Sequence, residues 1–161
     1  MNTVIRKGSP KDLPRLLELI IELAVYEKEP NAVVVTVEEL EKDGFGENAI
    51  FNFFVAEIDG IIQGIALYYF KYSTWKGKCL FLEDIVVNDK FRGKGVGKLL
   101  FDEVVTVAAS HQCKRMEWQV LKWNTPAIEF YKNKYDADLD AEWLNGRLIY
   151  DQIQELNKNL N

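Results

Sequence analysis

Apolar residues recur at two spacings along the chain, and the spacing changes from segment to segment. After the short strand-like "TVIRKG", Ser9 and Pro10 are typical of a helix start. The apolar positions that follow have helical spacing, at Leu13, Leu16, Leu17, Ile20 and Ala24. "TVEELEKDGFGE" predicts a second, shorter helix that Thr36 caps and Gly44 ends. The N-terminal part of the chain therefore predicts one strand and two helices.

A series of strands is predicted next. "FNFFVAEI" and "IIQGIALYYFKY" are joined by Asp59-Gly60, the strongest short hairpin signal in the sequence. "KCLFLEDIVV" is a third strand, and it is apolar almost throughout, as expected of a strand buried on both faces. Glu83 and Asp84 inside this strand need an explanation, because a buried charge is costly unless it is paired.

The second half of the chain predicts a strand–helix–strand unit and a final hairpin. A helical apolar stripe runs through Val96, Leu99, Leu100, Val104, Val107 and Ala108 and ends near Ser110. "KRMEWQVL" follows as a strand, which should lie parallel to "KCLFLEDIVV" in an otherwise antiparallel sheet. "NTPAIEFYKNKY" predicts a helix capped by Asn124 or Thr125, with Pro126 in its first turn. "ADLDAEW" and "RLIYDQI" predict a last hairpin around Asn145-Gly146.

Composition limits the classes of protein to consider. A chain of 161 residues with 48% hydrophobic content matches one compact domain over residues 1–161, and the order of the predicted strands and helices makes it an α/β (α+β) domain. The net charge of −5 argues against general attraction to nucleic acid. Cys79, Cys113 and His111 fit no metal-ligand spacing, so we expect no metal. Neither a signal peptide nor an apolar run of the roughly 20 residues that span a bilayer is apparent, so we expect a cytoplasmic protein without membrane contact.

The segment "FRGKGVGKLL" lies between a predicted strand and a predicted helix. Glycines at 93, 95 and 97 allow positive φ and close approach of a ligand, so several N–H groups could bind one anion, such as a phosphate. A plain loop is the simpler interpretation. A P-loop fails, because Gly97-Lys98 is followed by Leu99 and not by a hydroxyl residue. A dinucleotide fingerprint is weakened, because the spacing is G-x-G-x-G and not G-x-G-x-x-G.

The spacing R-x-x-G-x-G does occur, as Arg92, Gly95 and Gly97. With the antiparallel strands before it, this segment resembles the coenzyme A pyrophosphate loop of the GNAT family of N-acetyltransferases. "LAVYEKE", "DGFGE", "VAEIDG", "LYYFKYSTWKGK", "LEDIVV", "RGKGVG" and "WNTPAIEFYK" together resemble the diamine and thialysine branch of that family. The resemblance covers the chain in element order. It implies a mixed, mostly antiparallel sheet with a central pair of splayed parallel strands and about four helices.

The resemblance also implies a function. We expect an acetyl-CoA-dependent N-acetyltransferase that acts on a primary amine of a small polycation, such as a diamine, a polyamine or a thialysine-like amino acid, and that forms a homodimer. Alternatives are a non-catalytic acyl-CoA-binding regulatory module and a protein or peptide N-acetyltransferase. The implied cofactor-binding residues are Ile85, Val86, Val87, Arg92, Gly93, Lys94, Gly95, Val96, Gly97, Lys98, Asn124, Pro126 and Tyr131.

Acetyl transfer needs a neutral amine, yet an alkylamine of pKa about 10.4 is neutral only about once in 2,500 molecules at pH 7. Glu83 is the candidate base, acting through a water, because burial in an apolar strand should raise its pKa. From the residues alone, a carboxylate turned outward or paired with an arginine is an equal alternative, and the resemblance favours the base. Tyr131 is the acid that the resemblance implies for the leaving thiolate, although an aromatic residue beside Phe130 is more often core packing.

The resemblance further implies that Tyr26 and Glu27, at the end of the first helix, bind the amine together with Glu83, Asp84 and Trp143. The acidic run "EKE" would otherwise be a solvated helix end. One departure from the family pattern is that no glycine follows "FYK" to end the helix. The final hairpin matches only with a one-residue shift, so the role of Trp143 depends on that shift.

Overall fold

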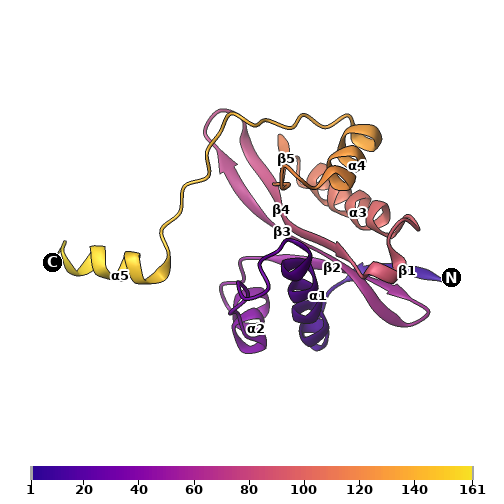
Figure 1. The fold of residues 1–161 in the computed structure, drawn as a ribbon, viewed down its shortest axis with the longest axis horizontal. Coiled ribbons are helices and arrows are strands. Elements are labelled where there is room, and N and C mark those ends of the chain that lie inside the picture. The colour runs from indigo at the N-terminus through magenta and orange to yellow at the C-terminus, as the bar shows by residue number, and fades with distance from the viewer. Residues whose placement is uncertain (1, 161) are drawn as a thin grey trace. The chain divides into compact units, whose positions relative to one another are not determined.

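The computed structural model describes residues 2–160, which divide into two compact units on either side of the boundary between Leu121 and Lys122. The first unit contains a sheet whose strands follow chain order (Figure 1). Its strands are β1 (Thr3–Lys7), β2 (Asn52–Ile58), β3 (Ile61–Ser73), β4 (Gly77–Val87) and β5 (Arg115–Glu117). Neighbouring strands are antiparallel except β4 and β5, which are parallel. The mixed sheet predicted from the sequence is therefore confirmed.

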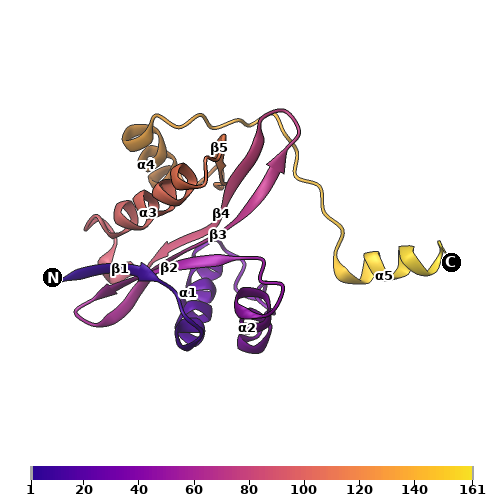
Figure 2. The ribbon, with the colours of Figure 1, turned by 180° about the vertical axis from the view of Figure 1, so that it is seen from behind.

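Helices cover both faces of this sheet (Figures 1 and 2). On one face lie α1 (Leu13–Tyr26), which follows a 3-10 turn at Pro10–Asp12, and α2 (Val37–Phe45). On the other face lies α3 (Val96–Ser110). The core under α1 includes Leu13, Leu16, Leu19, Val55 and Ile65, all fully buried. The stripe of α3 buries Val96, Leu100 and Val104. The helical spacings read from the sequence therefore form the two faces of one layered core.

The β2–β3 turn forms as predicted. Asp59 and Gly60 both have positive φ, 50° and 83°, which is the conformation of a two-residue hairpin turn.

The predicted end of α2 at Gly44 is wrong, because the helix continues to Phe45. Gly44 is needed for packing instead: a Cβ atom there would lie 2.6 Å from the Phe51 ring. A glycine near a helix end can thus reflect contact with a neighbouring ring and not a stop signal.

The second unit holds α4 (Thr125–Tyr135) and α5 (Tyr150–Lys158), and residues 136–149 form no strand. The predicted final hairpin is therefore wrong. The segment "RLIYDQI" enters α5, and the Gln152 side chain accepts a hydrogen bond from the Ile149 N–H at 3.0 Å, which caps the helix start. Ile149, Ile153, Leu156 and Leu160 have helical spacing, which competes with the hairpin signal of Asn145-Gly146.

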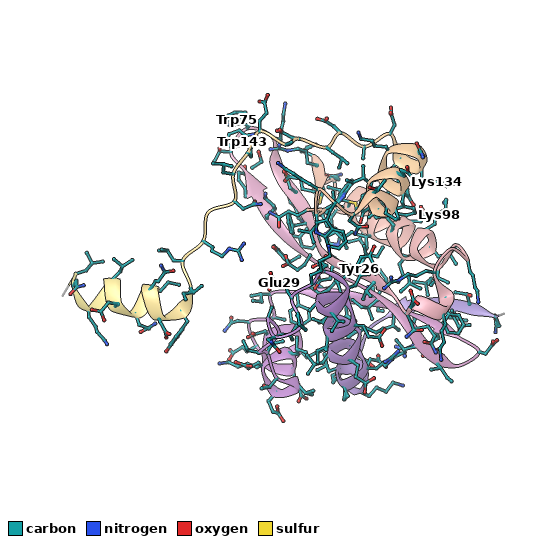
Figure 3. The ribbon with its side chains drawn as sticks, viewed as in Figure 1. Tyr26, Glu29, Trp75, Lys98, Lys134 and Trp143 are labelled. Carbon is teal, nitrogen blue, oxygen red and sulfur yellow. The ribbon has the colours of Figure 1, made fainter. Side chains whose placement is uncertain are left out.

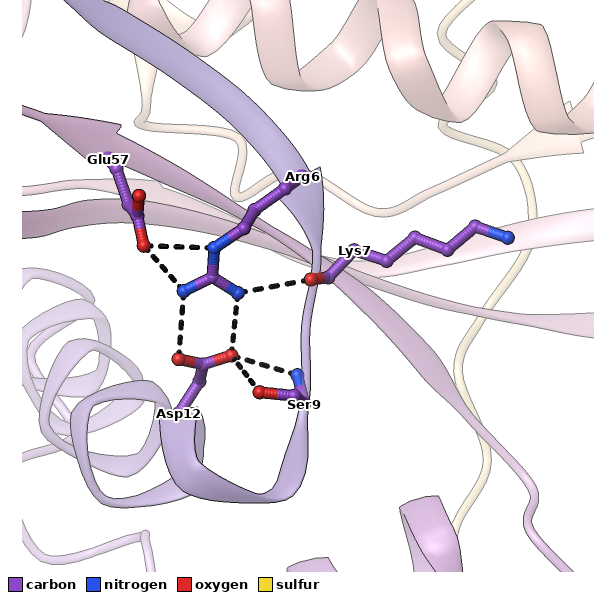
Figure 4. A network of polar contacts seen from close by, with 5 residues as sticks. All are labelled: Arg6, Lys7, Ser9, Asp12 and Glu57. Carbon is purple, nitrogen blue, oxygen red and sulfur yellow. Dashed lines mark hydrogen bonds and ion pairs between the residues drawn. The ribbon is translucent and has the colours of Figure 1, made fainter. Parts of the chain in front are cut away.

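An ion-pair network fixes the start of the first unit (Figure 4). Arg6 on β1 makes a bidentate contact to Asp12, with N···O distances of 2.8 and 2.9 Å, and its Nε donates to Glu57 of β2 at 2.9 Å. The Ser9 amide and hydroxyl donate to the same Asp12 carboxylate at 2.8 and 2.7 Å. Arg6 and these donors hold the pKa of Asp12 well below its usual range. The network ties β1, β2 and the entry into α1 together.

We expect Asp12→Asn to lower the free energy of unfolding by about 2 to 3 kcal/mol at pH 7, because Asp12 is nearly buried and Arg6 loses its partner. The pKa of the folded form is depressed, so this stabilisation is present above the unfolded value of about 3.9 and is lost as the pH falls through the folded value. Urea unfolding should therefore show the two proteins converging below about pH 4. Exposed Asp138→Asn is the control, and an equal loss in that variant, or a gap independent of pH, would contradict the prediction.

Candidate active site

The parallel pairing of β4 with β5 covers only three residue pairs, which end at Phe81 and Glu117. On its other side β4 stays paired with β3 as far as Val87. After Glu117 the chain leaves the sheet, and the Trp118 ring packs edge-on against Phe101 of α3 at 5.3 Å. The strand predicted to reach residue 121 therefore ends early. Along Leu82–Val87, β4 presents a backbone edge without a strand partner in the described chain, which an extended ligand could pair with.

Beside this open edge, β4 carries a β-bulge. Tyr68 of β3 lies opposite Leu82, and Leu67 lies opposite Asp84, so Glu83 is an extra residue. Asp84 shares the face of Leu67, which belongs to the core under α1. The Glu83 carboxylate reaches Tyr69, which packs against that same core, and accepts a hydrogen bond from its hydroxyl at 3.0 Å. The bulge thus directs two consecutive carboxylates to one face of the sheet.

The charges of Glu83 and Glu27 both act on Asp84. The pKa of Asp84 is raised to about 6, first by burial and then by the negative charges of Glu83 and Glu27. Burial also raises the pKa of Glu27, which directly follows α1. Glu83 itself is exposed, so the expectation of a buried Glu83 is wrong, and Asp84, which is half-buried, is the more enclosed of the two carboxylates. The bulge explains the difference, because it shifts the alternation of the strand by one residue.

The glycine segment forms a loop that ends at the start of α3. Gly93 and Gly95 have φ of 72° and 84°, and Gly95 is the N-cap residue of the helix. A Cβ atom at either position would meet nothing within 4 Å, so their left-handed backbone, and not lack of space, requires glycine. No side chain in the described chain caps α3. The first N–H groups of the helix are therefore left for a ligand, at the positive end of the helix dipole.

The basic residues of the loop differ in their surroundings. Lys98 forms an ion pair with Asp102 at 2.5 Å, one turn along α3. The guanidinium of Arg92 stacks over the Tyr26 ring at 4.6 Å, and its Nε donates to the Val87 carbonyl at 3.0 Å. Figure 3 shows Tyr26 at the C-terminal end of α1. Arg92 thus joins the predicted cofactor loop, the end of β4 and the predicted amine-binding end of α1.

The remaining predicted residues lie in the second unit. Asn124 caps α4, as predicted, and its Oδ1 accepts from the Ala127 N–H at 3.4 Å. Pro126 lies in the first turn. Tyr131 is buried, with its ring centroid 5.3 Å from that of Phe130. Asp136, with φ of 50°, ends the helix where a glycine had been expected. Trp143 is exposed, outside any helix or strand.

Sequence reasoning missed a groove of about 550 Å³ beside the carboxylates. Its lining residues are mostly apolar: Ala49, Ile50, Phe51, Asn52, Leu67, Tyr69 and Phe70. Tyr69 belongs both to this groove and to the hydrogen bond with Glu83. The sequence held only an indirect signal, since placing Tyr69 beside Glu83 requires the register of β3 and β4 and the position of the bulge.

Among residues 2–160, no group of three His, Cys, Asp or Glu side chains is placed to bind a metal ion. No helix of that range is long and apolar enough to span a membrane.

Comparison with known proteins identifies relatives over nearly the whole chain. The chain is 38% identical to thialysine N-epsilon-acetyltransferase of Sus scrofa, with 96% of this chain and 97% of that protein covered. It is 40% identical to the Bos taurus protein of the same name, with 95% and 96% covered. Spermidine/spermine N(1)-acetyltransferase-like protein 1 of Homo sapiens is 35% identical, with 86% of this chain and 21% of that protein covered.

Solved structures have the same fold. An integron cassette protein from the mobile metagenome of V. cholerae superposes with a TM-score of 0.79 at 25% identity, covering 98% of this chain and 99% of that one. An aminoglycoside N-acetyltransferase in complex with CoA gives 0.73 at 20% identity, covering 91% and 95%. The model of the acetyltransferase (GNAT) family matches residues 15–135. Together with the relatives above, this match confirms the family expected from the glycine loop, and the chain belongs to the GNAT family of acetyltransferases, which use acetyl-CoA.

Proposed function

We propose that this enzyme transfers the acetyl group of acetyl-CoA to a primary amine of a small polycation, that is, a diamine, a polyamine or a thialysine-like amino acid. The observation that carries the proposal is the group of Glu27, Glu83 and Asp84 beside the open edge of β4. Carboxylates at this place attract ammonium groups, and the edge accepts an extended cofactor. The identity to thialysine N-epsilon-acetyltransferases over nearly the full length supports the same substrate class.

In this proposal the cofactor occupies the glycine loop and the edge of β4. The pyrophosphate binds to the backbone of Arg92, Gly93, Lys94, Gly95, Val96, Gly97 and Lys98. The positive φ of Gly93 and Gly95 and the uncapped start of α3 support this placement. The pantetheine pairs with Ile85, Val86 and Val87, along the edge that β5 leaves open. Asn124, Pro126 and Tyr131 complete the site from α4, by the family resemblance.

Glu83 is the proposed base. It is exposed, so a water can reach it, and in the described chain only one of its oxygens, Oε2, accepts a hydrogen bond. Removing the ammonium proton is the main barrier. Because an alkylamine is almost entirely protonated at pH 7, forming its neutral state costs a free energy of roughly 4.6 kcal/mol. Asp84 is the second candidate, because a pKa of about 6 lies close to the working pH of a general base.

The later steps use a backbone N–H of β4 and the tyrosine that the family resemblance implies. The oxyanion of the tetrahedral intermediate is met by a backbone N–H near Ile85 or Val86, on the unpaired edge of β4. Tyr131 protonates the departing thiolate. Its assignment depends on the match of "IEFYK" to the family motif, and a phenol is a suitable acid because a thiolate needs only assistance to leave.

We further propose that the two compact units form one catalytic domain and that the protein is a cytoplasmic homodimer. The family match at residues 15–135 crosses the boundary between the units at Leu121, which supports a single domain. Ile153 and Leu156 of α5, with Ile149 and Leu160 just beyond its two ends, are exposed apolar residues at helical spacing, which supports contact with a second copy.

The direct test is to incubate the protein with acetyl-CoA and each of a panel of amines and to measure the release of the coenzyme A thiol. Diamines, polyamines and thialysine should react at least tenfold faster than a monoamine of equal length, because only they bring a second charge to the carboxylates. Coenzyme A binding without thiol release from any amine would favour a regulatory module. Acetylation of peptides but not of free amines would favour a protein acetyltransferase.

Asp84→Asn should raise the KM for the amine about tenfold and leave kcat within about twofold, since one charged hydrogen-bonding partner is lost. In the wild-type protein the pKa of Asp84 is raised to about 6, so the carboxyl is protonated below that pH and ionised above it. The KM for the amine should therefore fall as the pH rises through about 6, and the variant should lose this inflection. Steady-state kinetics from pH 5 to 8 measure both effects.

Asp59→Asn, at the β2–β3 turn, is the control, because that carboxylate accepts from the Asn2 N–H and lies outside the proposed site. A large loss of kcat in Asp84→Asn with an unchanged KM would instead make Asp84 the base.

A further inference from the structure

Tyr69 is the one residue whose side chain donates a hydrogen bond to Glu83 in the described chain. Its hydroxyl lies 3.0 Å from Oε2 of Glu83. The Tyr69 ring packs against Phe81, one residue pair before the bulge, with centroids 5.4 Å apart and ring planes inclined by 30°. The ring is therefore fixed by packing, and its hydroxyl is fixed by the carboxylate.

The bulge makes such a constraint necessary. Leu82 and Asp84 each have a partner residue on β3, whereas Glu83, the extra residue between them, has none. An unpaired residue on an exposed edge has more freedom than its neighbours, and a long carboxylate side chain adds rotamer freedom. A rigid aromatic donor removes that freedom at small entropic cost, because a packed tyrosine has few torsions left to lose.

The charges around Tyr69 and Glu83 favour a role for the Tyr69 hydroxyl as a hydrogen-bond donor. Glu83 is close enough to Asp84 to raise its pKa, and the charge of Glu27 acts on the same carboxyl. Burial, together with Glu83 and Asp84, raises the pKa of Tyr69 to about 12, so the phenol keeps its proton at neutral pH. Its hydroxyl can then only donate to the Glu83 carboxylate, which offsets part of the repulsion from the neighbouring acids.

We propose that Tyr69 is a positioning residue for Glu83: it fixes Oε2 and leaves Oε1 directed to the water or amine that loses its proton. This inference rests on the proposed function, in which Glu83 is the base. Tyr69 also lines the groove. In this proposal the hydrocarbon part of the amine lies in the groove, so Tyr69 both contacts the amine and orients the base.

Tyr69→Phe is the test, because it removes the hydroxyl and keeps the ring. With the best amine of the panel, kcat should fall about tenfold, equivalent to about 1.4 kcal/mol, while the KM for acetyl-CoA stays unchanged. Tyr68→Phe is the matched control, since Tyr68 is the adjacent residue, is buried, and packs its ring on Phe54 at 5.8 Å. It should keep kcat within about twofold. Thermal unfolding of both variants checks that the fold is intact.

The effect must also pass through Glu83. In a Glu83→Gln background, Tyr69→Phe should cause no further loss of kcat, because no carboxylate is left to orient. A full tenfold loss in that background, or a rise in the KM for the amine with kcat unchanged, would overturn the inference. If Glu83→Gln alone keeps full kcat, the role of Tyr69 falls together with that of the base, while the amine panel still decides whether the protein acetylates polycations.

Discussion

The short parallel ladder between β4 and β5 is the constraint on which the rest of the site depends. Three residue pairs hold the two strands together, and the ladder then stops while β4 continues on its β3 side to Val87. The N–H and C=O groups along the open edge of β4 need hydrogen-bond partners. A backbone polar group that a ligand covers but leaves unpaired costs free energy. The Trp118–Phe101 contact draws the chain after β5 towards α3 and away from β4. The fold therefore keeps a rigid strand with an open edge, as expected for a family that binds acetyl-CoA.

The bulge at Glu83 is the second constraint, and it acts on side chains instead of the backbone. A regular strand would place residues 83 and 84 on opposite faces. With the extra residue, Glu83 and Asp84 share one face of the sheet, and Glu27, which follows α1, is close enough to act on the pKa of Asp84. Arg92 links this place to the glycine loop through Tyr26. The glycine loop, the open edge of β4 and the carboxylates are thus neighbours, because β4 carries the edge and two of the carboxylates and the loop directly follows it.

Much of this could be predicted from local patterns. The Asp59-Gly60 turn, the left-handed glycines at 93 and 95 and the Asn124 cap are set by the conformations that their own residues prefer, and each formed as predicted. Gly97, which was grouped with those two glycines, lies inside α3 and does not have positive φ. The family was also recognisable, because several separated segments match in order.

Other features depend on partners far along the chain. The bulge follows from the register of β3 against β4, so the residues around Glu83 in the sequence do not indicate that Asp84 is the more enclosed carboxylate. Gly44 was mistaken for a helix stop because its contact is with Phe51. The last hairpin failed because Asn145-Gly146 signals a turn regardless of whether strands flank it, and Ile149 to Leu160 follow a helical period. The role of Tyr69 could not be seen until the register was known.

The central claim is that the edge of β4 beyond Phe81 and the loop at Gly93–Lys98 form one coenzyme A site. Amide hydrogen exchange measured by NMR with and without coenzyme A tests it most directly. Exchange should slow in the loop and at those amides of Leu82–Val87 that face away from β3, while the β1–β2 ladder is unchanged. Saturating coenzyme A, with binding verified by calorimetry, that leaves both segments unprotected would contradict the account.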